Sequence, residues 1–230
     1  MKIVYTTLTT LFAVITFNCS ANDTLFKFGQ NLPAGPQWSY KGGGTNLNGT
    51  GWRTAAYPET GWLTARPSAL RFGTTSPASN TTIPGDNTAG GAGPTGGRYP
   101  TLYFRKSINI ANPNAYTSFQ IRAKFDDAIV VWVNGSEAFR NNIIANPVYT
   151  TLSTTSMSGD GSVIYTGTVP TSLFNAGANI IAVEIHQTTA TSGDLFFDME
   201  LIGVNTLNVT RGPYLQIGSQ TGMTIRWRTD

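Results

Sequence analysis

Six consecutive apolar residues followed at once by a hairpin signal constrain this chain more than any other segment. The run Ala128–Val133 is apolar throughout, so a strand formed by it needs cover on both of its faces. Asn134-Gly135 follows directly, and both residues tolerate the positive φ angles of a two-residue β-hairpin. We therefore predict a central strand at Ala128–Val133 and a returning strand that begins at Glu137.

Further strands are predicted along the second half of the chain, at a spacing of about eight to twelve residues and without intervening helices. In residues 118–123, Phe119, Ile121 and Ala123 alternate with more polar side chains and so fall on one face. A helical turn or loop is expected at residues 173–179. The other predicted strands are residues 102–108, 137–140, 161–169, 180–186 and 195–202. This pattern is typical of a β-sandwich or barrel.

Composition supports an all-β chain and excludes several function classes. Only 12% of the 230 residues are charged, while 34 are Thr and 18 are Asn, a mixture that favours short strands and turns over surface helices. The net charge of +3 is small and dispersed, which argues against a nucleic-acid groove. One cysteine and one histidine exclude a disulfide framework, a thiolate zinc cluster and a multi-histidine metal site.

Residues 1–21 are predicted to be a signal peptide. A basic start is followed by a mostly apolar run to Phe17, and small residues precede a cleavage site after Ala21. The run is too short and too rich in Thr for a membrane span. We expect a secreted or periplasmic protein without a transmembrane segment in its mature form. A lipoprotein anchored through Cys19 is the less favoured alternative, because the residues before Cys19 fit a lipobox poorly.

The first half of the mature chain, residues 22–100, holds most of the long Gly, Pro and Thr stretches. Trp38, Trp52 and Trp62 are isolated aromatic anchors among turn residues. Residues 74–97 are nearly free of large apolar side chains, apart from Ile83, and are predicted to form a long surface loop.

Glu184 and His186 are a candidate acid–base or ligand pair, because residues two apart on a strand share a face. The structural alternative has His186 packed at a strand end and hydrogen-bonded to the backbone, with Glu184 paired to an arginine. We favour this alternative, since a lone histidine has few chemical partners in this chain.

Asp126 and Asp127 are adjacent at the entry of a strand, so their side chains are expected on opposite faces rather than as a catalytic pair. One would cap the turn, and the other would ligate a hard cation together with backbone carbonyls. Turn capping is the favoured interpretation. Asp194 and Asp198 carry a weaker version of the same ambiguity.

Aromatic side chains suggest a sugar-binding surface, because a flat ring stacks on the apolar face of a pyranose. The candidates are Trp38, Trp52, Tyr57, Trp62 and Tyr99. Packing in the protein core is the alternative for each of them.

Arg140 and Asn141, just after the predicted hairpin, offer planar donors suited to hydroxyl groups or a carboxylate. An ordinary exposed turn is the alternative. From these positions and the aromatic set, Trp52, Trp62, Tyr57, Arg140 and Asn141 are our candidate ligand-binding residues.

Four segments in order carry a resemblance: the three tryptophans, residues 103–106, residues 126–135 and residues 177–187. Together they resemble the galactose-binding-like β-sandwich of glycosidase sugar-binding domains, in the version that precedes secreted bacterial phosphoesterases. The resemblance covers residues 25–204 and implies an all-β jelly-roll sandwich over residues 22–205. It also implies a structural calcium, with Asp126 and Asp127 as candidate ligands.

A second resemblance begins after Asn208. Residues 209–216 and 223–230 are similar to the opening of purple acid phosphatase N-terminal domains, a fibronectin-like sandwich that precedes a binuclear metallophosphoesterase domain. Residues 206–230 are thus expected to be the truncated, incomplete start of such a domain. Two strands alone are marginally stable in water.

The residues and resemblances together predict an exported, non-catalytic binding or spacer module. It would be directed to a carbohydrate or cell-surface polymer and accompany a phosphoesterase domain that is missing here. One alternative is a fragment of a secreted acid phosphatase, with binuclear metal chemistry in the missing domain. Another is a calcium-stabilised structural sandwich. No nucleophile elbow, Walker loop, zincin helix or dinucleotide fingerprint is present, so no catalytic residue is assigned.

Overall fold

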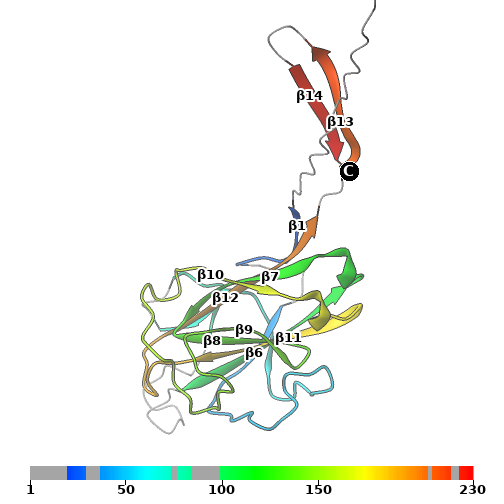
Figure 1. Cartoon of the computed structure of the whole chain (residues 1–230). Helices are drawn as coiled ribbons and strands as arrows, with labels where there is room; N and C mark the ends of the chain where they lie inside the picture. The colour runs from blue at the N-terminus through cyan, green and yellow to red at the C-terminus, as the bar shows by residue number, and fades with distance from the viewer. Residues whose placement is uncertain are drawn as a thin grey trace, which may run out of the picture. The chain divides into compact units, whose positions relative to one another are not determined.

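The computed structural model describes residues 20–29, 37–73, 77–83, 99–206, 209–218 and 223–229. A compact unit spans Asn22–Asn205, and a second unit contains the C-terminal hairpin (Figure 1). Residues 1–19 of the predicted leader, including Cys19, lie outside the described residues. Within the described part of the chain, no helix has the length and apolar character needed to cross a membrane.

One sheet of the larger unit, sheet A, is built around the long strands β7 (Ser118–Asp126) and β12 (Leu195–Thr206). Its strand order is β10-β7-β12-β4-β5, and β1 also pairs with β12. The remaining strands are β1 (Ser20–Phe26), β4 (Leu70–Phe72), β5 (Thr81–Thr82) and β10 (Tyr165–Val169). From β10 to β4 neighbouring strands are antiparallel, whereas β5 runs parallel to β4.

The second sheet, sheet B, is antiparallel and has the order β3-β2-β6-β11-β8-β9. Its centre consists of β6 (Thr101–Ile110), β11 (Gly177–His186) and β8 (Ala128–Val133). The outer strands are β2 (Trp38–Lys41), β3 (Leu63–Arg66) and β9 (Ser136–Asn141). Two 3-10 turns, Pro113–Ala115 and Thr171–Leu173, lie between strands.

The two sheets pack face to face around an aromatic core. Trp38 and Phe104 of sheet B both contact Phe197 of sheet A, with ring centroids 4.9 and 4.6 Å apart. The chain passes repeatedly from one sheet to the other: β6 is in sheet B, β7 in A, β8 and β9 in B, β10 in A, β11 in B and β12 in A. The prediction of an all-β sandwich is confirmed, and this alternation is the connectivity expected of a jelly roll.

Both faces of sheet B are covered, as the apolar run of β8 predicts. Ile129, Val131 and Val133 lie in the core between the sheets. Their neighbours Ala128, Val130 and Trp132 point the other way and belong to a second apolar cluster. All six residues are buried. Sheet B therefore carries one apolar layer against sheet A and another beneath loops on its outer face.

The predicted hairpin joins β8 to β9 through Asn134 and Gly135, whose φ angles are 51° and 92°. The Asn134 side chain also ties the turn to its surroundings. Its Oδ1 accepts a hydrogen bond from the backbone N–H of Ile180, and its Nδ2 donates to Leu173 O and Asn179 Oδ1. The turn is thus fixed by side-chain bonds as well as by backbone conformation.

The structure differs from the predicted strand pattern in several places. Strand β1 (Ser20–Phe26) is not predicted, and β11 begins at Gly177, inside the predicted turn or loop at residues 173–179. β10 begins at Tyr165 instead of residue 161, because Gly159 and Gly161 turn the chain with φ angles of 92° and 80°. In the first half, the short strands β2 to β5 form where isolated anchors and a loop are predicted. Strands of two to four residues are too short to show a period in sequence. Ile83, the apolar exception in the predicted loop, is buried.

The second unit contains an antiparallel pair, β13 (Val209–Gly218) and β14 (Met223–Thr229), with three register irregularities. The prediction of an incomplete domain at residues 206–230 is not tested by this pair of strands. Its assignment to a fibronectin-like domain stays a prediction.

We predict that Gly167→Ala lowers the free energy of unfolding by about 1–3 kcal/mol, measured by urea denaturation. Gly167 of β10 packs against Phe139 of β9, and a Cβ at this position would lie 2.3 Å from Phe139 Cδ2. The matched control is Gly51→Ala, whose Cβ would sit in ordinary contact, 3.5 Å from Thr54 Oγ1. Equal stability of the two variants would contradict the tight packing.

Candidate functional site

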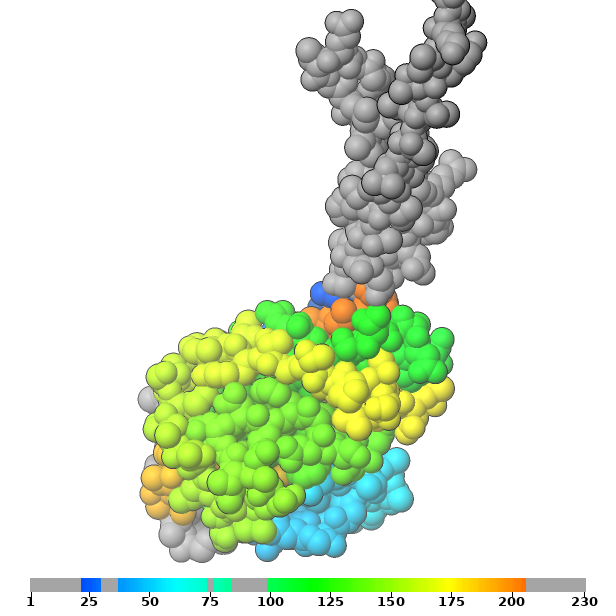
Figure 2. Space-filling model, in the orientation of Figure 1, coloured from blue at the N-terminus to red at the C-terminus, as the bar shows by residue number. Residues whose placement is uncertain are grey.

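A long loop between β2 and β3, residues 42–62, covers the outer face of sheet B, the face that points away from sheet A. We call this loop the strap; it forms much of the light-blue surface in Figure 2. Trp52 of the strap packs edge-on against Tyr103 of β6, with ring centroids 4.9 Å apart, and stacks with Trp62 at 6.4 Å. The strap supplies the apolar cover that this face of the sheet requires.

Arg105 of β6 anchors the middle of the strap. Its side chain is 2% exposed, and its two terminal nitrogens donate to the carbonyls of Tyr57 and Thr54 at 3.1 and 2.9 Å. Glu59 balances the charge at 3.3 Å and also accepts a 2.6 Å hydrogen bond from Ser39 Oγ of β2. Burial lowers the pKa of Arg105. A buried guanidinium on the sheet therefore holds the strap by its backbone.

Arg53 forms a second anchor, which reaches from the strap to sheet B. Its guanidinium lies 3.7 Å from the ring centroid of Trp132 and 3.2 Å from Glu184 Oε1. The same carboxylate oxygen accepts from Trp132 Nε1 at 3.2 Å. Glu184 is 1% exposed, so its charge is neutralised almost entirely by groups of the protein.

His186, at the end of β11, is completely buried. The carbonyl oxygen of Thr151 lies 2.7 Å from Nδ1 and accepts only, so Nδ1 carries a proton. Thr101 Oγ1 is 2.9 Å from the same nitrogen, and Nε2 faces Glu184 Oε2 at 3.7 Å. The structural interpretation is confirmed, because His186 bonds to backbone at a strand end and Glu184 pairs with an arginine. The two side chains are placed for packing and not for reaction with a solute.

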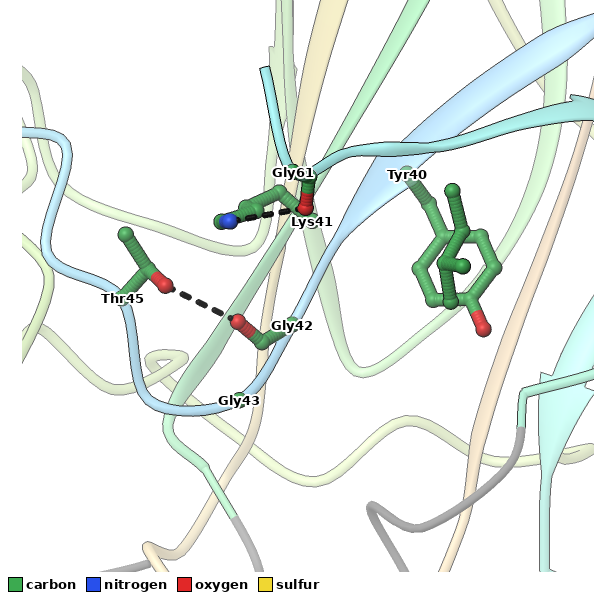
Figure 3. A pocket seen from close by; sticks show the side chains of 7 residues that line it. Tyr40, Lys41, Gly42, Gly43, Thr45 and Gly61 are labelled. Carbon is green, nitrogen blue, oxygen red and sulfur yellow. Dashed lines mark hydrogen bonds between the residues drawn. The ribbon is translucent and has the colours of Figure 1, made fainter. Parts of the chain in front are cut away.

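A surface hollow of about 360 Å³ lies at the neck of the strap, where the loop leaves β2 and returns to β3. It is lined by Tyr40, Lys41, Gly42, Gly43, Thr45, Gly61 and Leu63. Lys41 Nζ donates to the carbonyl of Gly61 at 2.8 Å and so joins the two ends of the loop (Figure 3). Thr45 Oγ1 donates to Gly42 O at 3.1 Å (Figure 3).

Gly61 makes room for the Lys41 ammonium. The φ angle of Gly61 is 73°, and a Cβ at this position would lie 3.1 Å from Lys41 Nζ. Gly43, with a φ angle of 69°, has no atom within 4 Å of a Cβ added at its own position. The lining of the hollow thus includes the Lys41 ammonium, the Thr45 hydroxyl and main-chain groups, and also Leu63, which is 42% exposed and faces Tyr40 across the strand pair.

The aromatic candidates do not form an open platform. Trp52 and Trp62 are buried at 1% and 7% exposure, because their rings cover sheet B. Trp38 and Tyr99 are buried as well. Tyr57 is half-buried and packs edge-on against Trp62 at 6.3 Å. Core packing, the alternative left open by the sequence, is what the structure shows for the four buried rings.

Arg140 and Asn141 lie on β9, at the other edge of sheet B from the hollow. Arg140 pairs with Glu137 at 3.0 Å and donates to Ile143 O at 3.3 Å. The structure therefore does not bring the five predicted ligand-binding residues together. The sequence analysis does not identify Lys41, Thr45 and Leu63 as residues that line a hollow. The signal that could have found them is a lysine followed by three glycines at the end of a strand.

Asp127 stabilises two loops. Its Oδ1 accepts from the backbone N–H of Met157 at 3.1 Å, and its Oδ2 accepts from that of Thr188 at 2.7 Å. The favoured turn-capping interpretation is confirmed for this residue. The expectation that the side chains of Asp126 and Asp127 point to opposite faces stays a prediction. The two residues sit at the junction of β7 and β8.

A structural calcium at Asp126 and Asp127, with backbone carbonyls as further ligands, stays a prediction. Within the described ranges, no group of three or more His, Cys, Asp or Glu side chains is arranged to hold a metal ion. Burial, together with the charges of Asp127, Asp194 and Asp160, raises the pKa of Asp126 to about 8. Asp198, like Asp127, accepts a hydrogen bond from a backbone N–H, that of Gly29 at 2.9 Å. Burial raises the pKa of Asp198 to about 6.

Comparison with known proteins finds distant structural neighbours. No protein-family model and no curated protein matches the chain. A Bacteroides uniformis β-glucuronidase 2 aligns at 12% identity and a TM-score of 0.45, over 86% of this chain and 20% of its own. An uncultured Clostridium β-glucuronidase aligns at 11% identity and a TM-score of 0.44, over 96% of this chain and 35% of its own. A β-glucuronidase from glycoside hydrolase family 2 aligns at 13% identity and a TM-score of 0.45, over 94% of this chain and 22% of its own. The chain thus spans about a fifth to a third of these proteins, and similarity at this level assigns neither family nor ligand.

We predict that Arg53→Met lowers the free energy of unfolding by about 2 kcal/mol. This is less than the about 3–5 kcal/mol of a fully buried pair, because Arg53 is 27% exposed. The double variant Arg53→Met/Glu184→Gln is expected to recover at least half of the loss, since it leaves no unpaired buried charge. Urea denaturation of the full cycle measures the coupling, and strictly additive single effects would contradict it.

Stability is predicted to fall as the pH rises from about 5 to 8. Asp126 and Asp198 bind protons more tightly in the folded than in the unfolded chain, so their contribution is complete below about pH 4 and is lost as the pH passes their folded pKa values of about 8 and 6. Asp126→Asn keeps a neutral side chain, so its Tm should exceed that of the wild type by about 3 °C at pH 8 and match it at about pH 4.

The matched control for this experiment is Asp160→Asn, which removes only a charge next to Asp126. It is expected to reduce the dependence of Tm on pH less than Asp126→Asn does. Identical Tm profiles for the wild type and Asp126→Asn would show that Asp126 is not the titrating group.

Proposed function

We propose that this chain is a non-catalytic carbohydrate-binding module and that the hollow at the neck of the strap is its binding surface. The observation that carries the proposal is the lining of the hollow, which includes an ammonium group, a hydroxyl, main-chain polar groups and an exposed leucine. A saccharide offers the matching surface, with hydroxyl edges and apolar C–H faces. At about 360 Å³, the hollow is within the about 300–1,000 Å³ range of ligand pockets.

Rigidity of the strap supports binding at its neck. Arg105 and Arg53 fix the loop to sheet B from its centre, and Lys41 ties its two ends together. A surface that is already ordered loses less conformational entropy when a ligand binds. The ionisable groups beneath the strap, Glu184 and His186, are buried in these contacts and so support a binding role over an acid–base one.

The wider context of the module rests on sequence. The predicted leader supports export, and the resemblance of residues 209–216 and 223–230 to purple acid phosphatase N-terminal domains supports a phosphoesterase domain in the same polypeptide. The alternative of a secreted acid phosphatase has the same support and concerns residues beyond this chain. A purely structural, calcium-stabilised sandwich is less favoured, because Asp127 already satisfies two loop amides.

The test is binding of soluble polysaccharides by affinity electrophoresis, comparing Leu63→Ser with Val163→Ser. The two side chains have nearly equal exposure, 42% and 43%, but only Leu63 lines the hollow. We expect Leu63→Ser to weaken binding about fivefold and Val163→Ser to leave it unchanged. Equal binding by both variants would remove the hollow as the site, and hydrolysis of chromogenic glycosides or phosphomonoesters by the pure chain would overturn the non-catalytic assignment.

A further inference from the structure

The chain contains two Asn-Gly dipeptides, Asn48-Gly49 in the strap and Asn134-Gly135 between β8 and β9. Glycine has no Cβ, so its backbone nitrogen is poorly shielded from the side chain of the residue before it. When that residue is asparagine, the nitrogen can attack the side-chain carboxamide, which is the first step of spontaneous deamidation. The two dipeptides have the same sequence, so their surroundings in the fold decide which of them reacts.

The carboxamide of Asn134 is held at both of its polar atoms. Its Oδ1 accepts from the backbone N–H of Ile180 at 2.9 Å. Its Nδ2 donates to Leu173 O at 2.9 Å and to Asn179 Oδ1 at 2.8 Å. A side chain fixed in this way cannot turn its Cγ toward the nitrogen of Gly135 unless this corner of the sandwich opens.

The surroundings of Asn48 are open. Its side chain is exposed, and its Oδ1 accepts one hydrogen bond, from the backbone N–H of Tyr149 at 3.1 Å. Among the described residues, neither Nδ2 of Asn48 nor the backbone N–H of Gly49 has a hydrogen-bond acceptor. Gly49 has a φ angle of 72° and no atom within 4 Å of a Cβ added at its position. The leaving group and the attacking nitrogen are therefore both free.

We propose that Asn48 is a site of spontaneous deamidation and that the fold protects Asn134 from the same reaction. The nitrogen of Gly49 forms a bond to Cγ of Asn48, and the bond from Cγ to Nδ2 breaks. Ammonia leaves with the amide proton of Gly49, and a succinimide ring remains. Water then opens the ring. Cleavage between Cγ and the nitrogen gives aspartate, and cleavage between the main-chain carbonyl carbon and the nitrogen gives isoaspartate.

The isoaspartate product would break a link between the strap and the loop after β9, residues 142–164. In isoaspartate the main chain runs through the former side chain, and the free carboxylate is attached to Cα in place of Cβ. Its oxygens no longer lie where Asn48 Oδ1 accepts from Tyr149. In aspartate a carboxylate oxygen keeps the position of Oδ1. Only the isoaspartate form therefore releases Tyr149, a residue that packs beneath the strap.

The test keeps the folded chain in mildly alkaline buffer and measures deamidation in tryptic peptides by tandem mass spectrometry. Peptide 42–53 contains Asn48, and peptide 125–140 contains Asn134. We expect Asn48 to react at least about tenfold faster than Asn134, because Asn134 must first lose its hydrogen bonds. Equal rates, or a faster rate at Asn134, would overturn the assignment.

The matched control is the same chain in urea, where both dipeptides lack tertiary contacts. Their rates are expected to become similar. A tenfold difference that persisted in urea would come from the local sequence and would overturn protection of Asn134 by the fold.

Hydrogen exchange at the backbone amide of Tyr149 tests the consequence. Exchange in the isoaspartate-containing chain should be about fivefold faster than in the fresh chain, as expected for the loss of one hydrogen bond. Asn48→Ala, which has no acceptor, should show the same increase, whereas Asn48→Asp should keep the exchange rate of the fresh chain. Unchanged exchange in both the isoaspartate-containing chain and Asn48→Ala would overturn the release of Tyr149.

Discussion

Burial of sheet B on both faces is the constraint on which the rest of the structure depends. The first face is satisfied by sheet A, but the second exposes Val130 and Trp132 unless another part of the chain covers them. The strap provides that cover together with Ile143 and Tyr149 of the loop after β9. It brings polar groups of the sheet, Arg105 and Glu184 above all, under a loop, where each needs a partner because buried charges are costly when unpaired.

The two arginine anchors explain how a loop of this length remains ordered. One guanidinium reaches from the sheet to carbonyls of the strap, and the other reaches from the strap to a carboxylate and a tryptophan ring of the sheet. Reciprocal anchoring leaves the neck of the loop as the place where polar groups stay accessible. The hollow is therefore a by-product of covering sheet B, shaped by where the strap begins and ends.

Local patterns in the sequence predict most of the sandwich, because alternation and apolar runs report burial directly. Phe119, Ile121 and Ala123 are all inside, and β8 has the predicted bounds. The site is harder to predict for a physical reason. Lys41 and Leu63 line one hollow only because a loop that is held elsewhere joins β2 to β3. An isolated tryptophan among glycines looks the same in sequence whether it covers a sheet or a sugar. For Trp52 and Trp62, only the tertiary structure separates the two roles.

The turn at Asn134 has a consequence for covalent modification. Asn134-Gly135-Ser136 is a triplet that an N-glycosylating host recognises, and attachment of a glycan uses the amide nitrogen. In the folded chain this nitrogen already donates to Leu173 O and Asn179 Oδ1. A glycan could be added only before β8, β9 and β11 come together, and a chain that received it would lack the bonds that close this corner of the sandwich.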